Sequence, residues 1–377
     1  MAGRSSLLIK KSDNTGSFVF LSINRTILIS LVILFFLLIL LFVLSSDKNA
    51  NPAADESEWD GAYGAQYPFI EDYDELSSRG INLVVNNITT EPGEWEKFYS
   101  AVVEQDLEII PVLWGDDQTA WSWNQEAEEW ELDINRYPDS IGAQFLQFLR
   151  KNPGYVEHTY AIYAFHEPFN PQNPKLINPS KIRKFWQQIH EEAFPNHELM
   201  IYGESISWNS ACANGCVDFD AIGLYNFTEC GPGGLLKYRV IEAVSGKDGL
   251  LIRSGSCTFS QKKMIQAGQE LIDRVHEFIQ QSPPAPDGSR TKHFALIQTF
   301  AQSSPGLTYR MPDAREMLEW GSQIVYPRGG KLAGVQWYVF RFDDLYDQTL
   351  GDNRYDEEGA DRWETISAVA AVLFGSK

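Results

Sequence analysis

The sequence predicts an α/β protein, a (β/α)8 barrel preceded by one transmembrane helix. Apolar runs of the kind found in buried parallel strands recur along the chain, with helical stretches between them. Residues 59–377 are long enough for one such barrel, which needs about 250 residues. The alternative, an open doubly wound sheet, is disfavoured because no glycine-rich phosphate fingerprint follows the first strand.

Eight strands and five helices are expected, with a helix after each of the first four strands and after the eighth. The strands are expected at 62–66, 81–88, 107–114, 159–165, 197–204, 219–227, 293–300 and 332–340, and the helices at 69–80, 94–105, 140–151, 180–194 and 362–374. Pro111 counts against the third strand, because proline removes a ladder donor. Residues 249–259 fit either a further strand or a loop across the barrel rim. An aromatic and acidic insertion at 115–137 is too long for a plain connection.

The N-terminal segment predicts a membrane anchor. Residues 26–44 contain no charge, and these 19 residues suffice to cross a bilayer core of about 30 Å. We expect the anchor at 26–45, a polar linker at 46–58 and the barrel domain at 59–377. The alternative is a signal peptide cleaved near residues 49–54, but its apolar region is usually only about 7–15 residues long.

Positive charges before the apolar run predict the orientation of the chain. By the positive-inside rule, residues 1–25 would be cytoplasmic and the barrel domain extracytoplasmic. The charges that carry this prediction are Arg4, Lys10, Lys11 and Arg25.

Four cysteines agree with an extracytoplasmic location. They lie within a short part of the chain, at Cys212, Cys216, Cys230 and Cys257. In an oxidising compartment such cysteines predict disulfides, whose pairing the sequence leaves open. A metal site is disfavoured because no matching Cys/His pair stands at zinc-finger spacing, and we expect neither a metal nor a cofactor.

The composition narrows the possible ligands. With 44% hydrophobic and 22% charged residues the chain is globular, and 13% aromatic residues, 11 of them Trp, favour a ligand that stacks on rings, such as a sugar. The net charge of −20 and the absence of a basic stripe after the first 50 residues argue against nucleic acid. The expected partners are therefore a carbohydrate and, through the anchor, a membrane.

The expected fourth strand runs directly into His166-Glu167-Pro168. In a parallel barrel, residues just past the carboxyl ends of strands line the active site. A carboxylate at this place, flanked by aromatic residues, makes Glu167 the best candidate for chemistry, although a Glu that caps the next helix would look the same. The other strand ends supply expected substrate-binding residues, namely Tyr63, Asn86, Trp114, His166, Tyr225, Asn226, Gln298, Trp337 and Tyr338.

These residues resemble those of the (β/α)8 glycoside hydrolases in which the fourth strand ends in Asn-Glu-Pro or Asp-Glu-Pro. His166-Glu167-Pro168 matches two of the three positions, and Trp337 fits the Trp that the eighth strand often carries in that group. The resemblance implies hydrolysis of O-glycosidic bonds of an oligo- or polysaccharide, with Glu167 as general acid. Its pKa would be raised by neighbouring aromatic residues.

One departure from that family concerns the nucleophile. The family carries a second Glu at the end of the seventh strand, where this chain has Gln298, Thr299 and Gln302. An amide cannot form a glycosyl-enzyme intermediate. Three alternatives remain: Glu167 pairs with Glu204 or Asp343, the enzyme inverts with a more distant carboxylate, or the barrel binds glycan without hydrolysis. Asp343 also suits a solvated acidic face.

Overall fold

A computed structural model describes residues 5–9, 19–23, 61–87, 92–112, 121–124, 129–132, 141–166, 200–204, 207–209, 214, 217–224, 227–229, 236–238, 241–246, 249–254, 261–285, 288–304, 307–341 and 346–375. The chain divides into two units, Met1–Glu56 and Ser57–Lys377. In the first unit, β1 (Ser5–Ile9) and β2 (Val19–Ile23) pair as an antiparallel hairpin. No helix in these ranges is long and apolar enough to cross a bilayer, and the predicted anchor at 26–45 lies outside them.

The second unit is built on eight parallel strands that are neighbours in chain order. The sheet order is β5-β4-β3-β19-β16-β11-β9-β8, so the first strand pairs with the second and with the last. The strands are β3 (Ala62–Gln66), β4 (Leu83–Asn86), β5 (Glu108–Pro111), β8 (Ala161–His166), β9 (Met200–Glu204), β11 (Phe219–Leu224), β16 (Lys292–Gln298) and β19 (Gly334–Tyr338). Each lies at or within an expected strand, or differs from it by one residue at an end.

The two outer strands of this order, β5 and β8, meet and close the sheet into a barrel. Ile109 N donates to His158 O at 2.8 Å, and Tyr160 N donates to Ile109 O at 2.9 Å. Parallel bridges join Ile109 to Thr159 and Val112 to Tyr163. We call this junction, where bridges replace a continuous ladder, the β5–β8 seam.

The seam explains why Pro111 is tolerated in a barrel strand. Val112 N donates to Asn86 O of β4, whereas Ile109 N donates to His158 O, so alternate residues of β5 face its two neighbours. Pro111 shares the side of Ile109 and therefore faces the seam. The backbone N–H that Pro111 lacks would therefore point toward β8, where few hydrogen bonds join the two strands.

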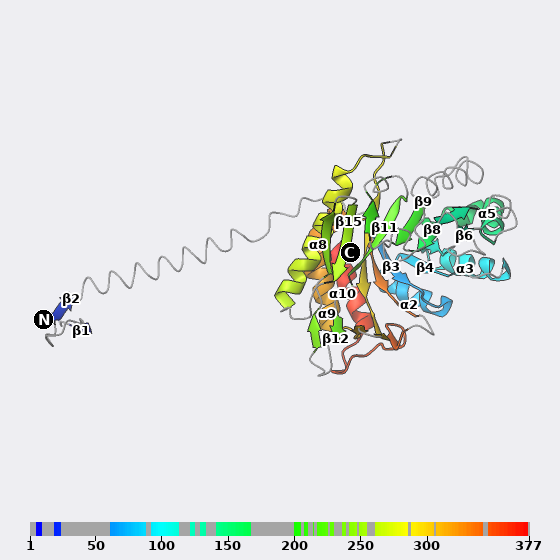
Figure 1. The fold of residues 1–377 in the computed structure, drawn as a ribbon. Coiled ribbons are helices and arrows are strands. Elements are labelled where there is room, and N and C mark those ends of the chain that lie inside the picture. Colours follow the sequence, from blue (N-terminus) through cyan, green and yellow to red (C-terminus); the bar gives the residue numbers. More distant parts are fainter. Residues whose placement is uncertain are drawn as a thin grey trace. The chain divides into compact units, whose positions relative to one another are not determined.

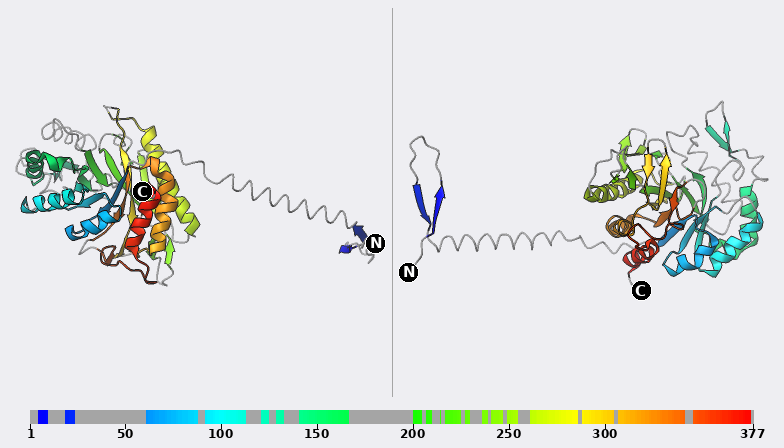
Figure 2. Two further views of the ribbon diagram at one scale, coloured as in Figure 1. Left: turned by 180° about the vertical axis from the view of Figure 1, so that it is seen from behind. Right: turned by 90° about the horizontal axis from the view of Figure 1, so that it is seen from below.

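Helices surround the strands (Figures 1 and 2). In chain order they are η2 (Ile70–Asp72), α2 (Tyr73–Ser78), α3 (Pro92–Glu104), α5 (Ile141–Lys151), α6 (Pro153–Val156), α8 (Gln261–Gln281), α9 (Ala314–Glu319), the π-helical η4 (Trp320–Val325), η5 (Tyr326–Lys331) and α10 (Arg362–Phe374). Four of the five expected helices are present, and the fifth, at 180–194, lies outside the described residues.

Side chains of the strands form two separate apolar layers. The inner layer fills the barrel and includes Ala62, Leu83, Ile110, Phe294 and Leu296. The outer layer lies between the strands and helices α8, α9 and α10, and it includes Tyr63, Ile297, Trp337, Ile366 and Leu373. Strands β3, β11 and β16 are thus buried on both faces, as in other parallel barrels.

Antiparallel strands extend the loops of the barrel. A five-stranded sheet joins segments that follow the sixth, seventh and eighth barrel strands, in the order β13 (Leu236–Tyr238), β12 (Phe227–Glu229), β18 (Leu307–Tyr309), β17 (Phe300–Ser304) and β20 (Gln348–Thr349). A second sheet has the order β10 (Ser207–Asn209), β15 (Gly249–Ser254), β14 (Ile241–Gly246). The segment that fitted either strand or loop is therefore strand β15 at its start. Within the aromatic insertion, β6 (Trp121–Asn124) and β7 (Glu129–Leu132) form a hairpin.

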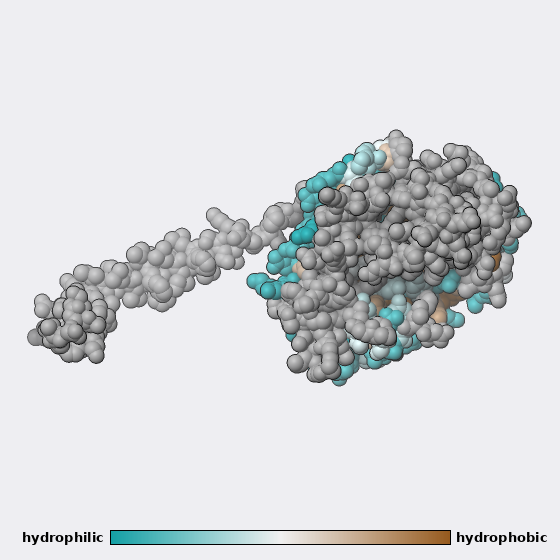
Figure 3. All heavy atoms as spheres, in the orientation of Figure 1, coloured by the Kyte–Doolittle hydropathy of each residue, from teal (hydrophilic) through white to brown (hydrophobic). Residues whose placement is uncertain are grey.

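The described surface is largely hydrophilic where it is visible in Figure 3. The large apolar side chains that are exposed among the described residues are Phe69, Val103, Leu318, Tyr326, Tyr355 and Phe374.

Candidate functional site

The ends of β8 and β9 lie side by side at the carboxyl end of the barrel. His166, the last residue of β8, is the register partner of Glu204, the last residue of β9. Glu204 is in turn the register partner of Ala221 of β11, whose side chain belongs to the inner layer. The register of β8 and β9 shifts between Tyr163 and Phe165, and the pair of His166 and Glu204 follows this shift at the carboxyl ends of both strands. Glu167 is the next residue after His166 and lies outside the described residues.

Gln298 ends β16 at the same end of the barrel, and its buried amide holds a neighbouring loop. Its Nε2 donates to Phe300 O at 3.1 Å and to Arg310 O at 2.8 Å. The side chain is completely buried. A carboxylate could not make either bond, because both partners are acceptors. The glutamine at the end of the seventh strand therefore stabilises the loop that carries Phe300 and Arg310.

An aromatic group stands beside Gln298. The Tyr338 ring makes edge contacts with Phe300 at 5.8 Å and with Tyr67 at 6.4 Å between ring centroids. Tyr346 packs on Phe300 at 4.7 Å, and its hydroxyl lies 2.9 Å from that of Tyr338. Tyr309 contacts Phe300 at 5.2 Å. Phe300 is buried beneath the tyrosines, which are all partly exposed. We call Tyr67, Tyr338 and Tyr346 the tyrosine platform.

The sequence predicted only Tyr338 of this group. Tyr67 and Tyr346 lie in loops, and tertiary contacts rather than a local pattern bring them to Tyr338. Their places in the sequence could have indicated them, because residues that follow barrel strands line the mouth. Tyr67 directly follows the first strand, and Phe300 closely follows the seventh.

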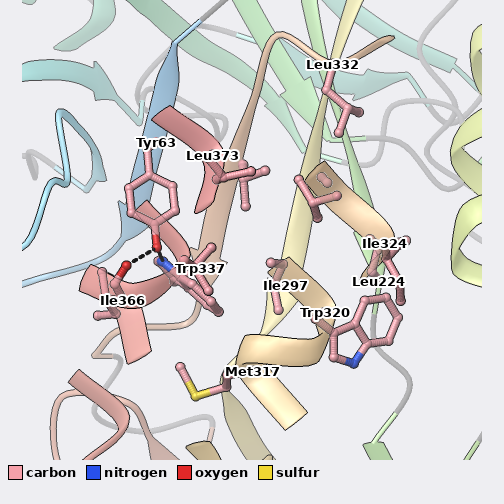
Figure 4. Packing of buried hydrophobic residues seen from close by; sticks show 14 of the residues in the cluster. Tyr63, Leu224, Ile297, Met317, Trp320, Ile324, Leu332, Trp337, Ile366 and Leu373 are labelled. Atoms are coloured by element: carbon pink, nitrogen blue, oxygen red, sulfur yellow. Dashed lines mark hydrogen bonds between the residues drawn. The ribbon is translucent and has the colours of Figure 1, made fainter. Parts of the chain in front are cut away.

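Two expected site residues, Tyr63 and Trp337, point away from the barrel mouth. Trp337 Nε1 donates to Tyr63 Oη at 2.8 Å, and Tyr63 Oη donates to Ile366 O of α10 at 2.8 Å (Figure 4). Both side chains are completely buried in the outer layer. Burial raises the pKa of Tyr63 well above its usual value, so the hydroxyl stays neutral. The expectation that these two residues line the mouth is corrected, because each stands one position out of phase with the inward-facing residues of its strand.

Asn86 is the third residue that the structure places differently from the prediction. It follows the inward-facing Val85, and its Nδ2 donates to Pro68 O at 2.6 Å and to Tyr73 Oη at 3.0 Å. Asn86 therefore anchors the loop after β3 to helix α2 from the outer side of the sheet.

The remaining expected residues lie outside the described ranges. They are the catalytic candidates Glu167 and Asp343, the substrate-binding candidates Trp114, Tyr225 and Asn226, and the four cysteines. For His166 and Glu204 the structure describes the backbone only. Within the part of the chain that the structure describes, no group of three or more His, Cys, Asp or Glu residues is arranged to hold a metal ion.

No protein-family model matches the chain. No curated protein matches it either.

Among solved structures, the chain is similar to several glycoside hydrolases. A family 39 glycoside hydrolase from Bacteroides cellulosilyticus WH2 is 12% identical with a TM-score of 0.48, over 86% of this chain and 66% of that one. A Bacteroidetes-affiliated family 5 cellulase is 11% identical with a TM-score of 0.47, over 87% and 94%. A family 17 β-1,3-glucanosyltransferase from Rhizomucor miehei is 10% identical with a TM-score of 0.46, over 78% and 92%. At this distance the likeness says nothing about the activity of this chain.

Proposed function

We propose that the chain is a membrane-anchored, extracytoplasmic glycoside hydrolase that acts on an oligo- or polysaccharide. The observation that carries the proposal is the register of β8 and β9, in which His166 pairs with Glu204. It supports two glutamates, Glu167 and Glu204, at the carboxyl ends of adjacent barrel strands, where such folds hold their active sites. The tyrosine platform at the same end offers ring faces for a sugar.

In this proposal Glu167 is the general acid and Glu204 its partner carboxylate. Glu167 protonates the leaving glycosidic oxygen as the bond to the anomeric carbon breaks. Glu204 either attacks that carbon, to be displaced later by water, or activates a water that attacks directly. The first route needs the two carboxyl groups about 5–5.5 Å apart and the second about 6.5–9.5 Å. Asp343 is the alternative partner, and Gln298 is excluded by its amide.

The test of the catalytic assignment is substitution of each carboxylate by its amide. We expect Glu167→Gln and Glu204→Gln each to lower the hydrolysis rate at least about 100-fold, while saccharide binding persists. The assay is release of reducing ends from a panel of neutral oligosaccharides, with unfolding temperature as a check of the fold. Full activity of Glu167→Gln would remove Glu167 from its role. Loss of activity in Asp343→Asn but not in Glu204→Gln would transfer the partner role to Asp343.

A second candidate function is glycan binding without hydrolysis, and the bonding of Gln298 favours it. The amide occupies the position of the family's nucleophile and is committed to two backbone carbonyls. Saccharide binding that Glu167→Gln leaves unchanged, with no hydrolysis by the native chain, would support this candidate over the enzyme.

Membrane attachment is tested separately from activity. We expect the full chain to remain with membranes after alkaline carbonate washing, and a chain lacking residues 1–45 to be released, because the apolar run at 26–44 is long enough to span. Release of the full chain by the same wash would contradict the anchor and favour a cleaved signal peptide.

A further inference from the structure

Two loops that carry the tyrosine platform are held together by one arginine. Tyr67 lies in the loop after β3, and Tyr346 lies in the loop after β19. Arg341 follows β19, and its Nε donates to Asp72 Oδ2 at 2.7 Å and its Nη2 to Asp72 Oδ1 at 3.0 Å. Such a two-fold bond between a guanidinium and a carboxylate fixes direction as well as distance.

Further contacts enclose this ion pair. The Nη1 of Arg341 donates to Asp352 Oδ1 at 2.6 Å, and Thr349 Oγ1 donates to Asp352 Oδ2 at 2.7 Å. The guanidinium also lies 5.1 Å from the centre of the Phe69 ring, which is a cation–π distance. The hydrogen bonds to Asp72 raise the pKa of Arg341, so the group remains charged.

The backbone at Gly351 packs closely against the side chain of Arg341. A Cβ added at Gly351 would lie 2.5 Å from Cγ of Arg341, so this position requires glycine. Phe340 N donates to Gln66 O at 2.8 Å, which joins the same two loops next to the ion pair. Tyr67 itself has a φ of 59°, a left-handed conformation that a tyrosine adopts only when its neighbours hold it there.

We infer that the tyrosine platform is a subsite for one sugar ring of an uncharged saccharide, and that Arg341, through Asp72, is the positioning residue that holds it. This inference rests on the proposed function and deepens it. The rings of Tyr67 and Tyr346 stand at 68° and 87° to the ring of Tyr338, so one ring of the platform stacks on the apolar face of a pyranose. The adjacent hydroxyls of Tyr338 and Tyr346 hydrogen-bond to the rim of the sugar.

The charges of the described residues around the tyrosine platform favour an uncharged sugar. Arg341 is matched by Asp72 and Asp352, and the other arginine near the platform, Arg310, is matched by Glu316. The chain as a whole has a net charge of −20, so it repels polyanions. A uronate or sulfate group would meet no uncommitted cation among these described residues.

The test compares saccharide affinities of full-length variants by titration calorimetry. The probes are neutral α- and β-linked glucose hexasaccharides and, as the anionic probe, hexagalacturonate. We expect Arg341→Met to weaken binding of the neutral probe about tenfold. Without the ion pair the two loops are less ordered in the free protein, and ordering them on binding costs free energy. Arg341→Lys keeps the positive charge but cannot form the two-fold hydrogen bond to Asp72, and it should give an intermediate affinity. The matched control is Arg328→Met, which breaks the Arg328–Asp273 pair at the outer helices and should leave affinity unchanged.

Each outcome supports or overturns a defined part of the inference. Native affinity in Arg341→Met, with the native chain binding a neutral probe, overturns the role of Arg341 and leaves the proposed function standing. Tighter binding of hexagalacturonate overturns the uncharged class. Binding of no probe by the native chain overturns the saccharide function itself. If Arg341→Met does not fold, Tyr346→Leu removes a platform ring without touching the ion pair, and unchanged affinity there overturns the subsite.

Discussion

At the scale of single residues, Gln298 shows how one atom decides which chemistry a position supports. An amide and a carboxylate have nearly the same shape, but only the amide has hydrogens to donate. The carbonyl oxygens of Phe300 and Arg310 both accept from Gln298 Nε2. The loop that follows β16 is therefore built around an amide, and a glutamate at this position would require a rearrangement of that loop.

Replacing Gln298 with Glu should accordingly destabilise the protein and not create a nucleophile. A buried carboxylate facing two carbonyl oxygens loses both bonds and repels its partners, which we expect to lower the free energy of unfolding by about 1–3 kcal/mol or more. Urea unfolding at pH 7 measures the change. Gln348→Glu, at an exposed residue of β20, is the control and should be near neutral. A Gln298→Glu variant as stable as the native chain would show that the loop can rearrange freely.

A second residue, His293, couples stability to pH. It lies in β16 against the outer helices, and burial lowers its pKa from 6.5 to about 3, with the positive charges of His276 and Lys331 acting in the same direction. Among the described residues, neither ring nitrogen of His293 has a hydrogen-bond partner, and the centre of the His276 ring lies 5.8 Å from that of His293. The folded state therefore keeps His293 neutral, while the unfolded chain takes up a proton below its ordinary pKa.

The sign of the pH effect follows from that difference. Stability contributed by neutral His293 is fully present above about pH 6.5 and is lost as the pH falls from 6.5 toward 3, at about 1.4 kcal/mol per pH unit. His293→Phe should flatten the dependence of unfolding free energy on pH between 6.5 and 4.5. An unchanged slope in that variant would assign the acid sensitivity to other groups.

At the scale of elements, the positions of the strands could be predicted from the sequence but the facing of their residues could not. Apolar runs bounded by turn residues located all eight barrel strands. Because both faces of a parallel strand are buried, its residues show no polar and apolar alternation that would tell inside from outside. Tyr63, Asn86 and Trp337 were expected at the barrel mouth but lie on the outer face of the sheet, whereas Gln298 and Tyr338 lie at the carboxyl ends of their strands, and their roles in substrate binding stay predictions.

Helix α8 was missed although its sequence carries a signal. Its buried residues include Met264, Leu271, Ile272, Val275 and Ile279, which follow helical spacing. Among the antiparallel strands of the loops, the sequence pointed only to β15, as one of two alternatives for residues 249–259, and the others are defined by their pairing in the folded chain.

Gly334, the first residue of β19, tests how tightly the eighth strand must approach the first. A Cβ there would fall on the carbonyl oxygen and the Cβ of Ala62 and against the Phe294 ring. We expect Gly334→Ala to destabilise the protein by about 1–3 kcal/mol. Gly93→Ala, in α3 with open space around it, should instead stabilise it by about 0.5–1 kcal/mol. Thermal unfolding distinguishes the two, and equal effects would mean that the barrel adjusts to a side chain at Gly334.

At the scale of the whole molecule, the order of the strands and the closure of the barrel follow from the alternation seen in the sequence. What the sequence could not supply is the long-range pairing, such as the ion pair that joins Asp72 to Arg341 and the loop sheet that gathers segments after three different strands. These contacts join residues far apart in the chain, and they shape the tyrosine platform. The loops at the mouth of the barrel are therefore harder to predict from the sequence than the barrel strands.

The β5–β8 seam should make amide hydrogens beside it exchange faster than those in the rest of the barrel. Seven of the neighbouring strand pairs share ladders, whereas the eighth contact depends on bridges beside a proline. Amide hydrogens of Ile109 and Tyr160 should therefore exchange with deuterium sooner than those of Ala295 and Leu296, which lie in β16 between two ladders. Equal protection at all four amides would contradict this. Local opening would then begin next to β8, the strand that leads to Glu167, while the rest of the wall stays closed.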